Sequence, residues 1–275
     1  MPVTYTPVRY PGGKTKLYPE IKAILEENDL IGCAYSEVFA GGAGLAMKLL
    51  LKGDVSSVTI NDYDRAVYCM WNMIVNHAGE LCEFIDDAVL DANTWLHHRE
   101  VYRHRDTADS RDLGCSTFYL NRTNVSGILS GGLIGGLEQT GNFKMDARFR
   151  KQGLKKKIQT IAARRDDIAV TCLDASDFID THLADSTLFA YFDPPYVQKG
   201  PGLYKSSFDE VGHRSLAAKI SSCPCKWVVT YDADNLIDNI YADYKKNDMD
   251  ITYTANLKTV GKEKIILGPG LRWPQ

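Results

Sequence analysis

The sequence lacks the features that mark membrane and secreted proteins. No apolar run approaches the roughly 18–20 residues that a membrane-spanning helix needs. Residues 1–10 contain no apolar signal-peptide core, so we expect a cytoplasmic protein. Seven cysteines, an odd number at irregular spacing, do not make a disulfide framework and fit reduced thiols. The one close pair, Cys223 and Cys225, has no second pair with which to bind zinc, so no metal is expected.

Internal repeats and low-complexity stretches are also absent, and the composition is that of a globular protein. Of the 275 residues, 44% are hydrophobic and 24% are charged, which excludes a disordered chain and allows a sizeable core. The net charge is only −3, but residues 97–165 carry 14 basic and 6 acidic side chains, against 18 and 29 in the rest of the chain. This basic block indicates either a surface for a polyanion or an ordinary solvated face, and charge alone does not decide between them.

Strand-like and helical segments alternate at both ends of the chain. The expected strands are residues 34–40, 57–60, 168–173, 187–193, 226–231, 250–254 and 264–267, and the expected helices are 45–52, 65–77, 210–221 and 235–241. This order predicts an α/β fold with a mostly parallel sheet, whose last two strands could form an antiparallel pair. Helical fragments and a glycine- and serine-rich segment interrupt the alternation. We therefore predict a domain made of residues 1–78 and 166–275, with an inserted, mainly helical subdomain at 79–165.

A glycine-rich turn, residues 39–44 (FAGGAG), follows the first expected strand. Glycines between a strand and a helix allow a ligand to approach the backbone at a helix N-terminus. Asp62, at the end of the next strand, can accept hydrogen bonds from both hydroxyls of a ribose. The pattern favours a nucleoside-containing cofactor, and a glycine turn without a ligand is the alternative. Met47 replaces the third glycine of the dinucleotide fingerprint, which disfavours a nicotinamide-dependent dehydrogenase.

The segment Arg9–Thr15 (RYPGGKT) resembles a phosphate-binding loop only in part. Val8 stands where that loop requires a glycine, and residues 1–7 do not resemble a buried strand. We therefore reject a nucleotide triphosphatase. The segment is then a flexible turn that carries an aromatic ring and a lysine.

The strongest signal is Asp193-Pro194-Pro195-Tyr196, directly after an apolar strand. An acid at the carboxyl end of a parallel strand lies where α/β proteins bind ligands. The tandem prolines stiffen the turn and can direct the Asp193 carboxylate and nearby carbonyl groups into a cleft. Together with the ring of Tyr196, these acceptors suit a planar amine such as the exocyclic amino group of a base. The alternative is a surface turn capped by an aspartate.

Taken together, these segments resemble the Dam-type DNA adenine-N6 methyltransferases (D12 class, alpha group). The resemblance rests on five motifs in the order of the family: residues 10–14 (YPGGK), 39–44 (FAGGAG), 61–62 (ND), 174–178 (DASDF) and 193–196 (DPPY). It implies the Rossmann-like fold of class I S-adenosylmethionine-dependent methyltransferases. It also implies that the inserted subdomain recognises DNA.

The resemblance further implies a role for each matching residue. S-adenosylmethionine, whose product is S-adenosylhomocysteine, would bind at Tyr10, Lys14, Phe39, Gly41, Gly44, Asp62, Asp177, Phe178 and Asp193. Asp62 would hold the ribose and Phe178 the cofactor adenine. The target adenine would flip out of double-stranded DNA and stack on Tyr196, while Asp193 and the Pro194 carbonyl accept its amino group. Direct transfer needs no metal and no covalent intermediate.

The basic insertion departs from the GATC-specific members, which leaves the target sequence open. Arg122 and Asn124 have side chains suited to guanine and adenine edges, and a turn-stabilising role is the equal alternative. Lys155, Lys156 and Lys157 are candidates for phosphate contacts. The resemblance suggests a bacterial or phage-encoded protein that acts as a monomer, with a restriction endonuclease as a genetic partner only.

Other chemistries remain as alternatives. Cytosine C5 methylation would need a cysteine in the cleft, and Cys225 precedes its strand and so lies at the wrong end. Cytosine N4 methylation uses similar chemistry, but the related enzymes more often carry serine at the position of Asp193. RNA or protein glutamine could replace DNA as the substrate. A non-enzymatic DNA-binding protein on a methyltransferase fold would bind the cofactor without turnover.

Overall fold

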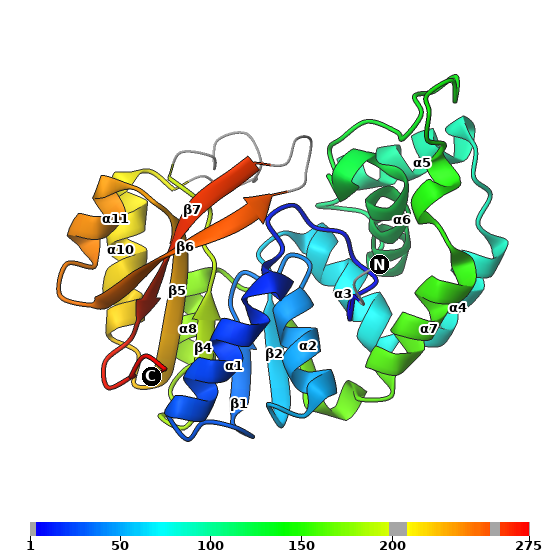
Figure 1. The fold of residues 1–275 in the computed structure, drawn as a ribbon. Helices are drawn as coiled ribbons and strands as arrows, with labels where there is room; N and C mark the ends of the chain where they lie inside the picture. The colour runs from blue at the N-terminus through cyan, green and yellow to red at the C-terminus, as the bar shows by residue number, and fades with distance from the viewer. Residues whose placement is uncertain (1–3, 198–207, 254–258, 275) are drawn as a thin grey trace.

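The computed structural model describes residues 4–197, 208–253 and 259–274 (Figure 1). Its centre is a seven-stranded sheet in the order β3-β2-β1-β4-β5-β7-β6. The strands are β1 (Ala34–Glu37), β2 (Ser57–Asn61), β3 (Ile168–Thr171), β4 (Phe189–Phe192), β5 (Lys226–Asp232), β6 (Lys245–Tyr253) and β7 (Thr259–Leu267). The first five strands are parallel, and β7 pairs antiparallel with both β5 and β6. The sheet is therefore mixed, with a parallel majority.

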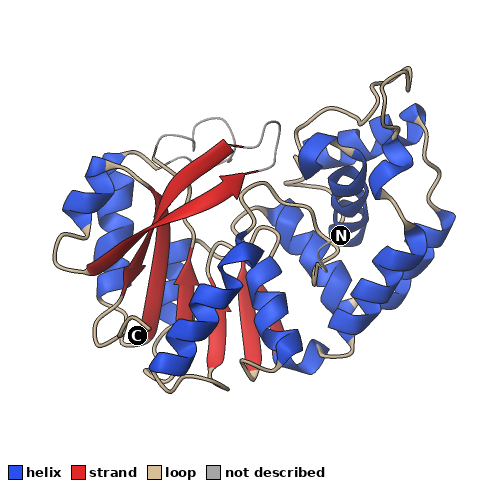
Figure 2. Ribbon diagram, in the orientation of Figure 1, coloured by secondary structure: helices blue, strands red, loops and turns tan. Residues whose placement is uncertain are grey.

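Helices cover both faces of the sheet (Figure 2). On one side lie α1 (Tyr18–Glu27), α2 (Gly44–Lys52) and α3 (Arg65–Asn76), and on the other α8 (Ala175–His182), α10 (Glu210–Ser221) and α11 (Asn235–Ile240). A hydrophobic core lies on each face of the sheet, and strand β4 contributes to both. Phe189 and Tyr191 belong to the core beneath α1, α2 and α3, and Ala190 and Phe192 to the core beneath α8, α10 and α11. Successive side chains of a strand point to opposite faces, which explains its unbroken apolar run.

Aspartates begin many of the helices. Their carboxylates accept hydrogen bonds from backbone N–H groups of the first turn, which have no partner within the helix. The capped helices are α3 (Asp64), α5 (Ala92–Arg103; Asp91), α6 (Ser110–Thr123; Asp109), α8 (Asp174), α10 (Asp209) and α11 (Asp234). Part of the acidic excess outside the basic block therefore defines where helices start.

The chain between α3 and β3 is mainly helical and lies to one side of the sheet (Figure 1). It contains α4 (Ala78–Asp87), α5, α6 and α7 (Lys151–Ala162), with short 3-10 turns η2 (Val125–Gly127) and η3 (Met145–Arg148) before α7. Helices α4, α6 and α7 pack on α3, and α5 packs on α6. A Cβ at Gly114 of α6 would lie 2.6 Å from the carbonyl oxygen of Cys69 in α3. Trp71 of α3 and Phe118 of α6 lie in one continuous buried core. The domain boundary at 79–165 stays a prediction.

The carboxyl-terminal hairpin is longer than the sequence predicts. Strand β6 begins at Lys245 and β7 at Thr259, whereas the expected strands begin at Asp250 and Lys264; Thr254, the expected end of the first, lies outside the described residues. The early part of β6 (KKND) is too polar to resemble a strand. It is tolerated because β6 is the edge strand, and Lys264 of β7 forms an ion pair with Asp248 across the hairpin, with the two atoms 3.0 Å apart.

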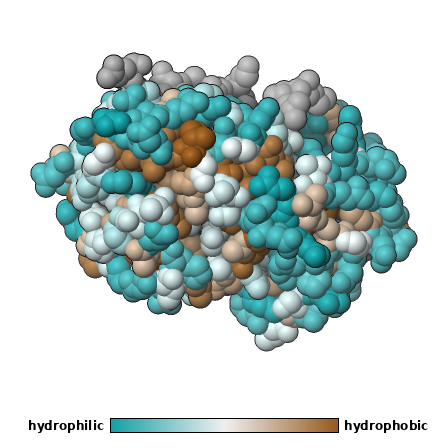
Figure 3. Space-filling model, turned by 90° about the horizontal axis from the view of Figure 1, so that it is seen from below, coloured by the Kyte–Doolittle hydropathy of each residue, from teal (hydrophilic) through white to brown (hydrophobic). Residues whose placement is uncertain are grey.

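The face that carries the amino ends of the parallel strands is mostly hydrophilic, with small separate apolar patches (Figure 3). Within the ranges that the structure describes, every helix is too short or too polar to cross a membrane.

Candidate active site

A cavity of about 460 Å³ lies at the carboxyl ends of the parallel strands. The loops after β1, β2, β3 and β4 all contribute to its wall, together with residues 10–14 and two segments of the helical region. Strand order reverses direction between β1 and β4, which is where open α/β sheets bind ligands. The residues that line the cavity include Tyr10, Lys14, Glu37, Phe39, Gly41, Gly44, Asp62, Tyr102, Arg105, Asp174, Ala175, Asp193 and Pro195.

The glycine turn connects β1 to α2 and lies under the N-terminal segment. Gly41 has φ +46°, and a Cβ there would come within 2.7 Å of the Tyr10 ring. A Cβ at Gly44, the first residue of α2, would overlap the hydroxyl of Thr15. Glycine at these positions therefore lets the segment that contains Tyr10 close over the turn.

Asp62 ties the glycine turn to the end of β2. Its carboxylate accepts hydrogen bonds from the backbone N–H of Gly41 (2.8 Å) and of Asp64 (3.0 Å). Burial raises the pKa of Asp62 to about 7, while these two hydrogen bonds act in the opposite direction. The carboxylate lies in the cavity wall and can accept hydroxyl groups of a ligand.

Glu37, at the end of β1, is a second acid in the cavity wall. It is 4% exposed, and its Oε2 atom accepts a hydrogen bond from the backbone N–H of Ala46 in the first turn of α2. Burial raises the pKa of Glu37 to about 8, to which the negative charge of Asp193 adds. Glu37 was not among the residues expected from the sequence, although an acid that ends a buried strand directly before a glycine turn could have indicated it.

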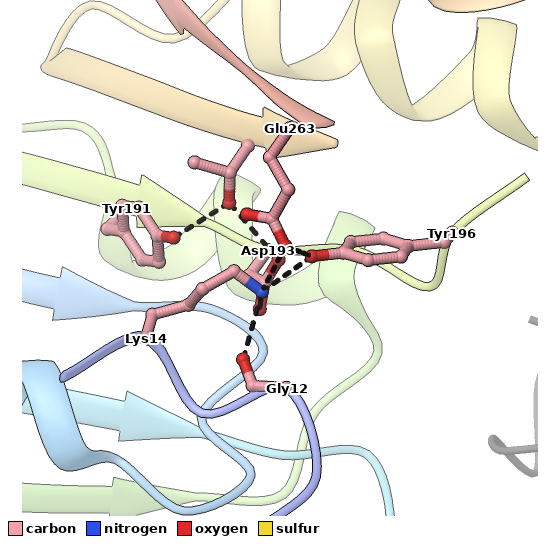
Figure 4. A network of polar contacts seen from close by, with 7 residues as sticks. Gly12, Lys14, Tyr191, Asp193, Tyr196 and Glu263 are labelled. Carbon is pink, nitrogen blue, oxygen red and sulfur yellow. Dashed lines mark hydrogen bonds and ion pairs between the residues drawn. The ribbon is translucent and has the colours of Figure 1, made fainter. Parts of the chain in front are cut away.

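Asp193 follows β4 and holds a network of polar contacts (Figure 4). Its Oδ2 atom lies 2.6 Å from the ammonium of Lys14, and its Oδ1 atom accepts the hydroxyl of Thr230 at 3.1 Å. Lys14 also donates to the Gly12 carbonyl (3.1 Å) and to the Tyr196 hydroxyl (2.7 Å). Both carboxylate oxygens of Asp193 are thus oriented by side chains from distant parts of the chain.

The pKa of Asp193 is raised to about 6, mainly by burial. The charge of Lys14 lowers this pKa, and the nearby carboxylate of Glu263 raises it. At neutral pH Asp193 therefore remains mostly ionised and able to accept hydrogen bonds.

Comparison with protein families identifies this combination of motifs. The family model of the D12 class N6 adenine-specific DNA methyltransferases matches residues 10–256. The chain belongs to this family. It is therefore an adenine-specific DNA methyltransferase, and its family depends on S-adenosylmethionine. A comparison with curated proteins gives no match.

The methyltransferase brings most of the expected cofactor residues to one cavity. Tyr10, Lys14, Phe39, Gly41, Gly44, Asp62 and Asp193 all line it. Phe178 does not: it is fully buried and stacks on His182, with ring centroids 4.7 Å apart. Asp177 is exposed on α8, and Asp174 and Ala175, about one helical turn earlier, line the cavity instead. The structure thus departs from the sequence expectation in α8, because Phe178 lies on the face of the helix that packs into the core and Asp177 lies on the exposed face.

The tetrapeptide Asp193-Pro194-Pro195-Tyr196 is partly enclosed. Pro194 is buried, whereas Pro195 lines the cavity. Tyr196 is 7% exposed, and its hydroxyl donates a short hydrogen bond to Glu263 of β7. Glu263 was not expected from the sequence, because one acid in a charged strand carries no local signal.

Two of the expected base-reading residues are engaged inside the methyltransferase. Asn124 is fully buried, accepts a hydrogen bond from Trp95 (2.7 Å) and donates to the carbonyl groups of Ile128 and Leu129. Arg122 donates to the carbonyl groups of Pro7 (2.9 Å) and Arg148 (2.8 Å). This geometry favours the turn-stabilising alternative for both residues.

The lysine triplet on α7 is also partly engaged. Lys155 forms an ion pair with Asp86, and Lys157 donates to the hydroxyl of Thr4 and the carbonyl of Thr6. Lys156 is exposed. A phosphate contact by this triplet therefore depends chiefly on Lys156.

The helical region adds cavity residues that the sequence analysis missed. Arg105 and Tyr102 line the cavity, and the guanidinium lies 5.1 Å from the centre of the Tyr102 ring. No motif surrounds these residues, so no sequence signal could have found them. Among the described residues, no cluster of three His, Cys, Asp or Glu side chains could hold a metal.

Proposed function

We propose that this chain methylates the N6 amino group of adenine at a specific sequence in double-stranded DNA by direct transfer, after the base has flipped out of the helix. One observation carries the proposal: Asp193 lies in the wall of the same cavity as Asp62 and the glycine turn. An acceptor for an amino group and an acceptor for a ribose are thereby held in one enclosed space.

The residues of the cavity fit S-adenosylmethionine. We assign the ribose to Asp62, the cofactor adenine to the start of α8 at Asp174 and Ala175, and the methionine part to the glycine turn beneath Tyr10 and Lys14. The volume of about 460 Å³ lies within the range of small-molecule sites. The bound cofactor supplies an activated methyl group on a positively charged sulfur.

The chemistry of the acceptor explains why Asp193 is needed. The lone pair of an adenine amino group is delocalised into the ring, so the nitrogen is a weak nucleophile. Hydrogen bonds from this amino group to Asp193 and to the Pro194 carbonyl favour a more pyramidal nitrogen and stabilise its developing positive charge. In this proposal the target base stacks on Tyr196, whose ring must become more accessible than its 7% exposure allows.

We assign DNA binding to the helical region at 79–165. A second hollow of about 310 Å³ borders the loop that also lines the main cavity, and it contains Arg9, Arg148 and the exposed ring of Phe143. Two arginines and an exposed aromatic ring suit a nucleic-acid backbone and its bases. Lys156 adds an exposed cation on α7. We further propose a cytoplasmic monomer of bacterial or phage origin, with a restriction endonuclease as a genetic partner only.

Cytosine N4 methylation is the second candidate, because the same acceptors could bind its amino group. Cytosine C5 methylation finds no support: Cys225 is buried and precedes β5, at the end of the sheet opposite to the cavity. A dehydrogenase finds none either, since Met47 is fully buried in α2 at the position of the fingerprint glycine.

Single-molecule sequencing of genomic DNA tests the proposal directly. The wild-type chain and Asp193→Asn are expressed separately in a host without DNA methylation. We expect N6-methyladenine in one defined sequence context with the wild type and none with the variant. N4-methylcytosine would replace the first candidate by the second. Cofactor binding without any modified base would indicate a DNA-binding protein on a methyltransferase fold, and RNA and protein are then tested as substrates.

A further inference from the structure

Lys14 lies between two carboxylates, of which the DPPY motif supplies only one (Figure 4). Its ammonium is 2.6 Å from Oδ2 of Asp193 and 3.7 Å from Oε1 of Glu263. The Lys14 side chain is 5% exposed, and that of Glu263 is fully buried. Glu263 lies on β7, beyond the residues that the family model matches.

The second carboxylate changes the charge that the target amino group meets. Lys14 and Asp193 alone would form a neutral pair, and a neutralised Asp193 is a poor acceptor for a nitrogen that becomes positive. Glu263 brings the buried cluster to a net charge of −1. Since the side chains of Lys14 and Glu263 are almost fully buried, this negative charge is screened less than a charge at the surface would be.

Glu263 also holds the aromatic residue of the motif. The Tyr196 hydroxyl donates a short hydrogen bond to Oε1 of Glu263 and accepts one from Lys14. Strand β7 pairs with β5, whose Thr230 donates to the other oxygen of Asp193. Adjacent antiparallel strands thus support the tetrapeptide from behind the cavity.

We propose that Glu263 is a positioning residue for methyl transfer: it anchors Tyr196, and its charge offsets that of Lys14, so that the cluster of Lys14, Asp193 and Glu263 stays net negative beside the amino group that Asp193 accepts. The inference rests on the catalytic role proposed for Asp193. Glu263 itself need not touch DNA or cofactor.

A pH profile separates this role from a merely structural one. The ionisable groups that act on Asp193 or are acted on by it come from several elements: Lys14 (η1, Lys14–Leu17), Glu37 and Tyr35 (β1), Tyr191 (β4), Tyr231 (β5) and Glu263 (β7). Of these, Glu263 raises the pKa of Asp193. Loss of its charge in Glu263→Gln must therefore lower the pH at which the rate of methyl transfer begins to fall on the acid side of its pH profile (the acid limb).

The test measures single-turnover methyl transfer to duplex DNA between pH 5 and 9 for wild type, Glu263→Gln and Tyr196→Phe. Glutamine keeps the shape of Glu263 and can still accept the Tyr196 hydroxyl. We expect Glu263→Gln to lower the plateau rate on the order of tenfold, to shift the acid limb downward and to leave cofactor affinity within about twofold. Tyr196→Phe, the matched control, removes the hydroxyl without removing the charge and leaves the limb in place.

A double-mutant cycle guards against a variant that merely folds poorly. In the Lys14→Gln background no cation remains for Glu263 to balance, so adding Glu263→Gln should cost little or restore part of the rate. The inference would be overturned if the rate losses of the two single variants multiplied in the double variant. It would also be overturned if the pH at which the rate of Glu263→Gln falls on the acid side were the same as in the wild type. An active Asp193→Asn enzyme would instead overturn the proposed function, and the role of Glu263 with it.

Discussion

The ammonium of Lys14 lies 2.6 Å from the Oδ2 atom of Asp193, although 179 positions separate them in the sequence. The N-terminal segment that carries Lys14 runs over the glycine turn and also contacts the helical region, where the Asn121 side chain bonds both the N–H and the carbonyl of Arg9. One short segment therefore touches the proposed catalytic acid, the proposed cofactor site and the proposed DNA-binding region.

The pH dependence of methyl transfer should report the ionisation of Asp193. Burial raises the pKa of this carboxyl to about 6, and its ionised form is the one that stabilises an amino group as it becomes positive. We expect the single-turnover rate to fall about tenfold for each pH unit below 6 and to be flat between pH 7 and 8. A rate that stays constant down to pH 5 would contradict this assignment.

Protein stability should depend on pH through Glu37. Its pKa is about 8 in the folded protein and 4.5 for an ordinary glutamate, so between these values the folded state holds a proton that the unfolded state has lost. The contribution of Glu37 to the free energy of unfolding therefore falls as pH rises, by about 1.4 kcal/mol per unit. Glu37→Gln should flatten the decrease in Tm between pH 5 and 8, and Glu83→Gln, at an exposed position, should not.

Asp62→Asn should weaken binding of S-adenosylmethionine. A carboxylate that accepts ligand hydroxyls contributes about 1.5–3 kcal/mol, which corresponds to a loss in affinity of roughly 10- to 100-fold by calorimetry. Asp177→Asn serves as the control on α8, because Asp177 is exposed and does not line the cavity. Equal losses in the two variants would return Asp177 to the cofactor site.

The salt dependence of DNA binding should distinguish the lysines of α7. Lys156 is exposed, whereas Lys155 already forms an ion pair with Asp86. We expect Lys156→Gln to reduce the slope of log affinity against log salt by about 1, and Lys155→Gln to change it less. Identical slopes for wild type and Lys156→Gln would remove Lys156 from the DNA-binding surface.

The sequence alone was sufficient to predict that the main polar groups of the cavity lie close together. Asp62, Asp193 and the glycine turn each follow a parallel strand, and the carboxyl ends of such strands meet at one edge of a sheet. The motifs then indicated the family, which the family model confirms for residues 10–256.

Other features depend on contacts that local patterns do not encode. Asn124 has a side chain suited to reading a base, but its partner Trp95 lies 29 residues away and holds it inside the protein. Glu263 reaches the site only through the pairing of β7 with β5. Phe178 follows an aspartate-capped helix start, and the rotation of that helix decides which of its residues face the cavity.

The helical region at 79–165 shares its core with the rest of the protein. Trp71 of α3 lies in the same buried core as Trp95 and Phe118. Exchanging residues 79–165 between relatives would therefore expose buried side chains of α3, which also packs on the sheet. If the hollow of Arg9 and Arg148 binds DNA as proposed, changes in target preference would disturb this core least at the exposed residues between η2 and η3, since Leu133 of that segment belongs to the core. A new target specificity would then evolve by substitutions in that segment while the core residues stay the same.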